Sequence, residues 1–252
     1  MTSAPVRLGA WLMIPDPIVV EAAALAGFDW VGIDLQHGTW DLGLAFRGIQ
    51  LLDVLGVPSV VRLGRDDLAD LPRVCDHGAS GVVIAMATEP DLVARAISMA
   101  RYQPSGERSY GGQRYGMRAA PIDPAEVRPA VYAMIEDRRG LEAVEAIAAV
   151  PGLAGLHIGP VDLALGLGLG SDPSGPAYDA ALRRIREAAR ATGISAVLHA
   201  VRGHEAEARR SEGFDELVLP ADIGLLRGAF STELAVARGG TVEPYGPYGL
   251  RR

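Results

Sequence analysis

The sequence predicts a single (β/α)8 barrel (a TIM barrel) over residues 1–238, followed by a C-terminal tail over residues 239–252. Three observations predict this fold. The chain has 252 residues, which is a usual size for one such barrel. Apolar, β-rich segments alternate with helical patterns, giving eight successive strand and helix units. The β-rich segments are apolar at consecutive positions, as strands of a parallel sheet buried on both faces require.

The expected strands are short apolar runs rich in Val, Ile and Leu, separated from one another by the helical patterns. They cover residues 7–13, 30–35, 59–63, 81–86, 130–135, 155–158, 196–200 and 216–220. An open, doubly wound sheet is the alternative arrangement of such units. No Gly-x-Gly-x-x-Gly motif follows a strand, so nothing indicates the dinucleotide site of that fold.

The expected helices follow the strands, and several of them end at a glycine, which favours helix termination. They cover residues 18–26, 42–55, 68–76, 90–101, 141–150, 178–192, 204–211 and 223–237. Two loops, 103–128 and 166–177, are longer than the others. The second follows a strand closely and is therefore expected at the catalytic face. The glycine-rich run Gly166–Gly170 is interpreted as a short turn or a helix end.

Composition and charge exclude several classes of protein. Apolar residues make up 49% of the chain and charged residues 22%, so the chain can bury a full core. No apolar run approaches the ~20 residues that cross a bilayer, and residues 1–7 contain no signal core, so we expect a cytoplasmic protein without a membrane partner. The net charge is −7 and no basic stripe carries interleaved aromatics, which disfavours nucleic acid. The single cysteine, Cys75, excludes an intramolecular disulfide.

The active site of a β/α barrel forms where the strands end at their carboxyl side. Polar residues interrupt the apolar pattern at several of these strand ends. They are Asp34, Gln36, His37, Arg62, Glu136, Asp137, Asp162, His199 and Asp222. Because the strand ends of a barrel gather at one face, we expect these side chains to converge although they are far apart in the sequence.

Glu136 and Asp162 follow neighbouring strands and are the candidate metal ligands. Mg²⁺ and similar hard divalent cations prefer oxygen ligands and keep several waters, so two carboxylates suffice on the protein side. No His or Cys pair has the spacing of a zinc site. The residues alone leave two alternatives open, namely ion pairs with barrel arginines and, for Asp162, a helix N-cap.

Arg62 lies within an apolar strand, and a buried guanidinium needs an anionic partner. That partner is either a substrate oxyanion or a carboxylate such as Asp34 or Glu136. His37 is a candidate general base because an imidazole can gain or lose a proton near neutral pH. Asp76, at a helix end, is a candidate partner for His37. The alternative for His37 is a loop histidine without a chemical role.

The sequence contains no lysine. An enzyme that works through an imine with its substrate needs a lysine as its nucleophile, so that route is excluded for this chain. The remaining histidines are interpreted as structural; they are His77, His157, His199 and His204.

Six segments of the chain resemble the HpcH/HpaI family of class II pyruvate aldolases, which includes 4-hydroxy-2-oxoheptanedioate aldolase and 2-dehydro-3-deoxyglucarate aldolase. The segments are GFDWVGIDLQHG (27–38), PSVVRLG (58–64), DHGASGVVIAM (76–86), ARYQPSGERSYG (100–111), AMIED (133–137) and GLAGLHIGPVDLALGLG (152–168). They span most of the chain in the order of the family, and the IGPVDL signature is specific. The sequence departs from the commonest family pattern at Gln36, Met134 and Asp137.

The resemblance implies a role for each candidate residue. Glu136 and Asp162 match the two metal ligands of the family. Arg62 matches the arginine that contacts the keto oxygen of pyruvate and stabilises the enolate. His37 matches the base, and Asp76 matches the carboxylate paired with that base.

The resemblance also implies a substrate-binding segment, Gly159-Pro160-Val161-Asp162. The backbone amides of Val161 and Asp162 would receive the substrate carboxylate at the start of a helix. Family members are typically hexamers, or trimers of dimers, with the last helix exchanged between neighbours. We therefore expect a homo-oligomer, with the tail over residues 239–252 packed on a neighbouring subunit.

The reaction that the resemblance implies is the reversible retro-aldol cleavage of a 4-hydroxy-2-oxo acid to pyruvate, or hydroxypyruvate, and an aldehyde. His37 serves as the base for the 4-hydroxyl proton, and the C3–C4 bond breaks. A divalent metal (Mg²⁺, Mn²⁺ or Co²⁺) and Arg62 stabilise the enolate. Two alternatives remain: a malyl- or citramalyl-CoA lyase on the same barrel, and a metabolite-binding barrel without catalysis.

Overall fold

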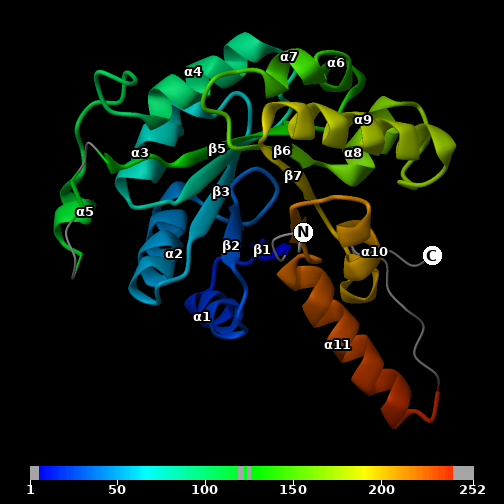
Figure 1. Cartoon of the computed structure of the whole chain (residues 1–252). Coiled ribbons are helices and arrows are strands. Elements are labelled where there is room, and N and C mark those ends of the chain that lie inside the picture. Colours follow the sequence, from blue (N-terminus) through cyan, green and yellow to red (C-terminus); the bar gives the residue numbers. More distant parts are fainter. Residues whose placement is uncertain (1–5, 119–121, 124–125, 241–252) are drawn as a thin grey trace.

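The computed structural model describes residues 6–118, 122–123 and 126–240, and its centre is a closed barrel of parallel strands in chain order (Figure 1). The strands are β1 (Arg7–Leu12), β2 (Trp30–Asp34), β3 (Ser59–Leu63), β4 (Gly81–Ile84), β5 (Ala130–Ile135), β6 (Gly155–Ile158), β7 (Ser195–Leu198) and β8 (Glu216–Val218). Each strand pairs with the next, and β8 pairs with β1. The predicted (β/α)8 barrel is confirmed, and the open sheet is excluded.

Helices surround the barrel (Figure 1). An aspartate side chain caps the N-terminus of each of the first two helices. The Asp16 carboxylate accepts a hydrogen bond from the Ile18 N–H at 2.8 Å, and Asp41 accepts one from the Leu44 N–H at 2.7 Å. The helices are α1 (Pro17–Leu25), α2 (Leu42–Val54), α3 (Leu71–Asp76), α4 (Pro90–Ala100), α5 (Gln113–Gly116), α6 (Arg138–Glu142), α7 (Val144–Ala148), α8 (Pro160–Gly166), α9 (Pro176–Thr192), α10 (Ala206–Ser211) and α11 (Asp222–Ala237). Short 3-10 turns, η1 (Leu68–Asp70) and η3 (Gly203–Glu205), precede α3 and α10.

Two hydrophobic clusters hold the barrel, one between strands and helices and one inside it. The inner cluster contains two tryptophans, and each faces a glycine on the paired strand: Trp11 opposite Gly32, and Trp30 opposite Gly9. A Cβ atom on Gly32 would lie 2.2 Å from the Trp11 ring, and one on Gly9 would lie 2.5 Å from the Trp30 ring. These glycines therefore give two indoles room in the barrel interior.

Most predicted elements agree with the structure within two residues, and β3, β5 and β6 agree at both ends. The predicted helix over residues 141–150 is wrong, because the chain forms α6 and α7 there. α6 begins earlier, at Arg138, because the Asp137 carboxylate accepts a hydrogen bond from the Gly140 N–H at 2.6 Å. Helix α8 is absent from the helices that the sequence pattern predicts, although the resemblance implied a helix start at this segment; it begins at Pro160, whose fixed φ suits the first helical position. The run Gly166–Gly170 follows as a helix end, as predicted.

The described part of the long loop over residues 103–128 lies at the amino end of the barrel, because the loop connects α4 to β5. Its described part contains the short helix α5, which the sequence did not predict. Arg114 and Arg118 form ion pairs with Asp53 of α2 at 2.7 and 2.8 Å. The described part of the loop is thus fixed to its own chain, away from the carboxyl ends of the strands.

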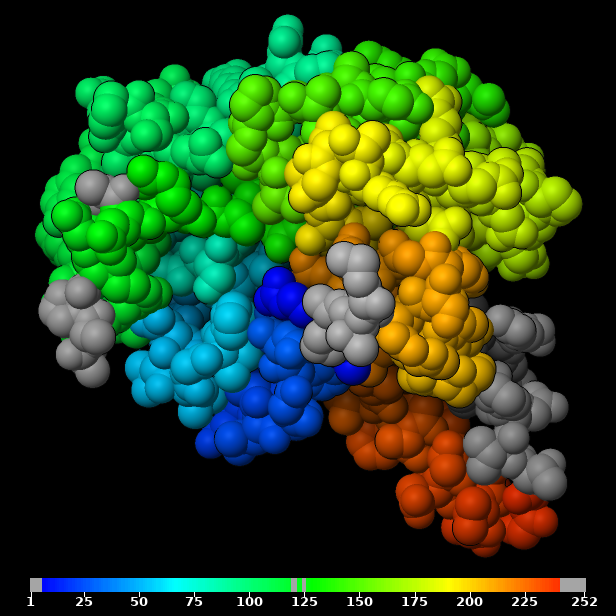
Figure 2. All heavy atoms as spheres, in the orientation of Figure 1, coloured from blue at the N-terminus to red at the C-terminus, as the bar shows by residue number. Residues whose placement is uncertain are grey.

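Helix α11 projects from the barrel (Figures 1 and 2). Several of its large apolar side chains are exposed, and Phe230 is 72% exposed. The others are Ile223, Leu225, Leu226, Leu234 and Val236. The predicted tail lies outside the described residues from position 241 onward. In the described ranges, no helix combines the length and the apolar character needed to cross a membrane.

Candidate active site

Asp34 ends β2 and is only 1% exposed. Its Oδ1 accepts hydrogen bonds from Arg62 Nε at 2.9 Å and from the backbone N–H groups of Gln36 and His37, each at 3.1 Å. Its Oδ2 accepts from Arg62 Nη2 and from Trp11 Nε1. Burial alone would raise the pKa of Asp34, but the hydrogen bonds and the charge of Arg62 outweigh burial and lower the pKa. Asp34 is therefore a permanent anion that fixes its neighbours.

Arg62 lies next to Asp34 in the β2–β3 register and is 8% exposed. Two of its nitrogens donate to the two oxygens of Asp34. Its Nη1 lies 3.7 Å from Met134 Sδ, and its Cζ lies 5.4 Å from the centre of the Trp11 ring. The predicted carboxylate partner for Arg62 is thus Asp34. This pairing holds the guanidinium in one orientation at the mouth of the barrel, which is the end where the carboxyl ends of the strands lie.

Glu136 follows β5 and is 3% exposed. Its Oε1 accepts a hydrogen bond from the Met86 N–H at 2.6 Å. A Cβ atom on Gly159 would lie 2.5 Å from Glu136 Oε2, so only glycine leaves room for this carboxylate. Burial raises the pKa of Glu136 to about 7, against the opposing effects of Met86 and Arg62 and with a further contribution from Asp162.

Asp162 lies in the first turn of α8 with an exposed side chain. The N-cap of α8 is Gly159, and no side chain makes a capping hydrogen bond there, so the N-cap alternative for Asp162 is wrong. The charge of Asp162 raises the pKa of Glu136, which places the two carboxylates within electrostatic reach of each other. They come from consecutive strand ends, as the sequence predicted.

The two carboxylates fit the ligand set of a hard divalent cation. The described part of the chain holds no group of three or more His, Cys, Asp or Glu side chains in metal-binding geometry. Two protein carboxylates are sufficient for Mg²⁺-like ions, which keep several waters. Among the described residues, the Glu136 carboxylate has the Met86 N–H as its hydrogen-bond donor and has no ion pair. A buried carboxylate beside a second one therefore lacks the countercharge that a metal would supply.

The substrate-binding segment predicted from the resemblance begins α8. Gly159 is the N-cap and Pro160 is the first helical residue. The first intrahelical hydrogen bond runs from the Leu163 N–H to the Gly159 carbonyl, at 2.9 Å. The amides of Val161 and Asp162 precede this bond, so they belong to the donors that a helix leaves unpaired at its start. Their position allows them to bind an anionic group next to Glu136.

His37 and Asp76 are not brought together within one chain. His37 follows the carboxyl end of β2 and has an exposed side chain. Asp76 ends α3 and precedes β4, so it lies at the amino end of the barrel. There its Oδ1 accepts a hydrogen bond from the Tyr102 hydroxyl at 3.1 Å and lies 3.7 Å from Arg108 Nε. Burial raises the pKa of Asp76, although Tyr102 and Arg108 oppose it.

Two further polar residues have structural contacts. His77 stacks on Phe46 with ring centres 3.6 Å apart, as expected for a structural histidine. Asp222 accepts hydrogen bonds from the backbone N–H groups of Met13 and Ile14 at 2.9 and 3.0 Å. It therefore holds the loop that follows β1.

Three features of the mouth were not predicted from the sequence: the indole of Trp11, the amide of Met86, and a contact between His157 and His199. Trp11 lies in an apolar strand segment that predicts only a core position. The hydrogen bond from its Nε1 to Asp34 depends on where the fold places Asp34. Met86 has a φ of 51°, which a non-glycine residue rarely adopts and which no local pattern indicates. The two histidines lie at similar positions near the carboxyl ends of the neighbouring strands β6 and β7, and this similarity is the only sign of their contact in the sequence.

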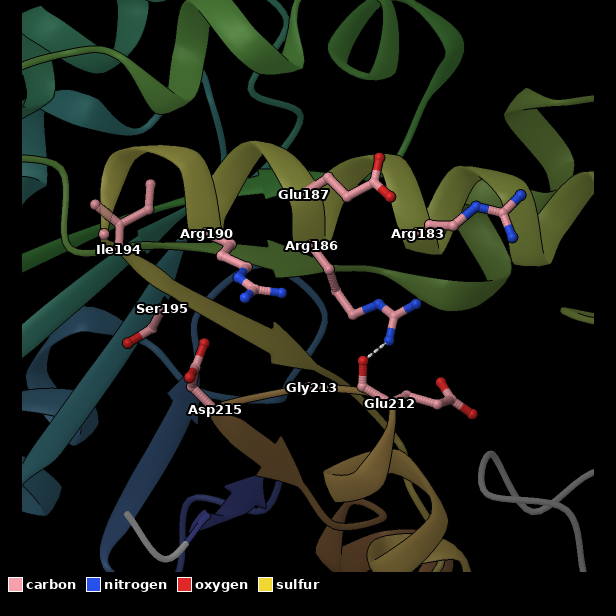
Figure 3. A pocket seen from close by; sticks show the side chains of 10 residues that line it. Arg183, Arg186, Glu187, Arg190, Ile194, Ser195, Glu212, Gly213 and Asp215 are labelled. Atoms are coloured by element: carbon pink, nitrogen blue, oxygen red, sulfur yellow. Dashed lines mark hydrogen bonds between the residues drawn. The ribbon is translucent and has the colours of Figure 1, made fainter. Parts of the chain in front are cut away.

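A separate surface hollow of about 610 Å³ lies near the amino ends of β7 and β8 (Figure 3). Arg183, Arg186 and Arg190 of α9 line it opposite Glu212 and Asp215. Arg186 already donates to the Glu212 carbonyl oxygen. The hollow is at the end of the barrel opposite to Arg62 and Glu136, so it is not the predicted site.

Comparison with known proteins shows which family the chain belongs to. Residues 7–224 match the family described as HpcH/HpaI aldolase/citrate lyase. The chain belongs to this family. A hydroxypyruvate/pyruvate aldolase of Paraburkholderia phytofirmans is 35% identical over 225 residues, which cover 85% of this chain and 86% of that protein. A 5-keto-4-deoxy-D-glucarate aldolase of Klebsiella pneumoniae is 30% identical over 231 residues, which cover 89% of each protein.

A solved structure of an HpcH/HpaI family protein from Burkholderia cenocepacia agrees with the fold. It has a TM-score of 0.84 and 30% sequence identity, and the match covers 92% of this chain and 95% of that one. Membership of the HpcH/HpaI family confirms the resemblance seen in the sequence. It also confirms the predicted enzyme class, a carbon–carbon lyase of the aldolase type.

Proposed function

We propose that this HpcH/HpaI family member is a class II aldolase that reversibly cleaves a 4-hydroxy-2-oxo acid to pyruvate or hydroxypyruvate and an aldehyde. The observation that carries the proposal is the buried Glu136 carboxylate beside Asp162 and near Arg62, in a chain without lysine. This arrangement suits an enolate held by a metal and an arginine, and an imine mechanism has no nucleophile here.

Glu136 and Asp162 are the proposed ligands of a divalent metal, Mg²⁺, Mn²⁺ or Co²⁺. When bound there, such an ion supplies Lewis-acid stabilisation of the negative charge that develops on the substrate keto oxygen. The residues of the chain fit this role because both ligands are carboxylates and Gly159 leaves room for Glu136.

The remaining roles follow the course of the reaction. The amides of Val161 and Asp162 bind the substrate carboxylate, next to Gly159 and Pro160. His37 takes the proton of the 4-hydroxyl, the C4 oxygen becomes the aldehyde carbonyl, and the electrons of the C3–C4 bond pass to the enolate. Arg62, fixed by Asp34, stabilises the enolate oxygen. Protonation of the enolate at C3 then gives pyruvate.

The role proposed for Asp76 requires a second copy of the chain, because Asp76 and His37 of one chain lie at opposite ends of the barrel. We propose that Asp76 of one subunit orients His37 of a neighbour in a homo-oligomer, a hexamer or trimer of dimers. The exposed apolar side chains of α11 are suited to such an assembly. We also propose a cytoplasmic location for the protein. Mixing inactive His37→Asn and Asp76→Asn variants should restore part of the activity, since mixed oligomers contain sites with both residues intact.

The names of the relatives guide the choice of substrate. Hydroxypyruvate/pyruvate aldolases are among the relatives, and so are aldolases named for 5-keto-4-deoxy-D-glucarate and 4-hydroxy-2-oxovalerate. We therefore propose pyruvate and hydroxypyruvate as the nucleophiles in the direction of synthesis.

The test is turnover with and without a chelator. Purified protein treated with chelator should lose pyruvate formation from a 4-hydroxy-2-oxo acid, and Mn²⁺, Co²⁺ or Mg²⁺ should restore it. Glu136→Ala and Asp162→Ala should abolish the metal-dependent activity, whereas Glu187→Ala on the outer face of α9 should retain it. Full turnover in chelator would overturn the proposal.

The same assay separates the two alternatives. A malyl- or citramalyl-CoA lyase would cleave a CoA thioester rather than a free acid. A metabolite-binding barrel without catalysis would bind metal and pyruvate but would not exchange protons of the pyruvate methyl group with deuterated water. Cleavage of the free acid together with methyl exchange supports the aldolase.

A further inference from the structure

Two histidines contact each other at the mouth of the barrel. His157 lies in β6 and is 1% exposed, whereas His199 follows β7 and is partly exposed. His157 Nδ1 and His199 Nε2 are 2.9 Å apart. His157 is paired in register with Val197, two residues before His199, so both histidines point to the interior side of the barrel.

The contact constrains the protonation of both imidazole rings. One nitrogen must donate and the other must accept, so a neutral pair satisfies the hydrogen bond. Burial, and in second place the positive charge of Arg62, lowers the pKa of His199 well below its usual value, and His157 is shifted in the same direction. His199 is therefore an uncharged hydrogen-bonding group at working pH.

The His199 ring is also held from its other sides. It meets the Trp11 ring edge to face, with ring centres 4.3 Å apart. Ala200, the next residue, has a φ of 57°, a strained conformation for a residue with a side chain, and such residues cluster at functional sites. Trp11 also donates to Asp34 and lies against Arg62, so His199 shares one wall of the mouth with Arg62.

We propose that His199, oriented by His157, is a further substrate-contacting residue and recognises a hydroxyl group of the substrate. This inference rests on the proposed aldolase function. Its sequence basis is the pair His157 and His199 in the segments LHIG (156–159) and VLHA (197–200).

The chemistry of the pair favours a hydroxyl over other groups. A carboxylate or phosphate would need a cation, and a second positive charge beside Arg62 is disfavoured. A methyl group offers no hydrogen bond and would leave the partly buried imidazole unpaired. A hydroxyl both donates and accepts, so it suits either tautomer of His199. Hydroxypyruvate differs from pyruvate by one hydroxyl, and a hydroxylated aldehyde is the second possible source.

The experiment compares four substrate pairs in the metal-loaded enzyme. Pyruvate and hydroxypyruvate serve as nucleophiles, and propanal and glycolaldehyde serve as acceptors. His199→Phe keeps an aromatic ring against Trp11 but removes the hydrogen bond. It should lower the ratio of kcat/KM for hydroxypyruvate over pyruvate about tenfold, the order expected for one hydrogen bond. His199→Gln should recover part of the ratio, and the exposed-residue control His204→Phe should retain the wild-type ratio.

His157→Phe tests the positioning role, because it leaves His199 in place without its partner. We expect the same change of ratio in the same direction, smaller than in His199→Phe. A change confined to glycolaldehyde assigns the recognised hydroxyl to the acceptor. Equal losses with all four pairs, or unchanged ratios both for hydroxypyruvate over pyruvate and for glycolaldehyde over propanal, would refute the inference.

Binding provides a readout that does not depend on turnover. With Mn²⁺ present, the dissociation constants of pyruvate and hydroxypyruvate are measured by quenching of tryptophan fluorescence. A wild-type protein that forms no product with any pair would refute the aldolase. The inference then stands or falls on whether His199→Phe weakens hydroxypyruvate binding several-fold more than pyruvate binding.

Discussion

Glu136→Gln should change how the stability of the metal-free protein depends on pH. Glutamine has nearly the shape of glutamic acid and carries no ionisable group. In the folded protein, burial raises the pKa of Glu136 from an ordinary value of 4.5 to about 7. The folded state therefore holds this proton more tightly than the unfolded chain does, and the substitution removes that difference.

The size of the effect follows from proton linkage. The stability that a group with a raised pKa contributes is complete below pH 4.5 and is lost as the pH rises through about 7. Each tenfold change in proton affinity corresponds to about 1.4 kcal/mol, so the full loss amounts to roughly 3 kcal/mol. Glu136 is 3% exposed, so solvent screens this effect little.

Urea unfolding at pH 5 and pH 8, with chelator and at one fixed protein concentration, measures this difference. Between these pH values the wild-type protein should lose about 2–3 kcal/mol more than Glu136→Gln does. Glu187→Gln, on the exposed side of α9, should follow the wild type. Added Mn²⁺ should stabilise the wild type at pH 8 but not Glu136→Gln. Identical pH profiles for wild type and Glu136→Gln would refute a buried, uncompensated carboxylate at this position.

Three further substitutions test the contacts around Glu136 and Arg62. Gly159→Ala places a Cβ atom 2.5 Å from Glu136 Oε2, so the apparent affinity for Mn²⁺ should fall on the order of 10–100-fold without loss of helical circular dichroism; wild-type affinity would contradict this. Arg62→Lys keeps the positive charge but loses the contact of two nitrogens with Asp34, so kcat/KM should fall by about 10²-fold or more. An unchanged kcat/KM would show that Arg62 does not stabilise the enolate. Asp34→Asn leaves Arg62 buried without its counterion, so the free energy of unfolding, measured in urea, should decrease by about 3–5 kcal/mol; a loss under about 1 kcal/mol would show that water compensates Arg62.

Sequence patterns predicted the barrel because its strands are buried on both faces, and that burial leaves short apolar runs that alternate with helical patterns along the chain. They failed for α8, whose seven residues begin at a Gly-Pro pair that also fits a turn. They also failed at the start of α6, where the decisive contact is the cap between Asp137 and Gly140. Both errors concern short helices whose starts are set by a local contact or by a proline rather than by an apolar stripe.

The site was predictable to the extent that it depends on strand ends. Asp34, Arg62 and Glu136 meet because each occupies the carboxyl end of a parallel strand. The contact of Met86 depends on a backbone angle that has no sequence signature. The contact of His199 depends on ring orientations that the similar positions of the two histidines do not specify. The pairing of Asp76 with His37 was predicted from the helix-end position of Asp76 and from the resemblance, and the topology of one chain separates the two residues.

The charges at the mouth explain why an acidic protein can bind an anionic 2-oxo acid. Asp34 and Arg62 form an ion pair there whose charges offset each other, and Glu136, Asp162 and Asp137 add negative charge in their ionised forms. Such a site repels a substrate carboxylate, because Asp34 already offsets Arg62. A divalent cation held by Glu136 and Asp162 would offset the charges of these two carboxylates and add a local positive centre beside the amides of α8. We therefore expect a metal to bind before the substrate, and pyruvate should show no measurable binding in chelator even to a fully folded protein.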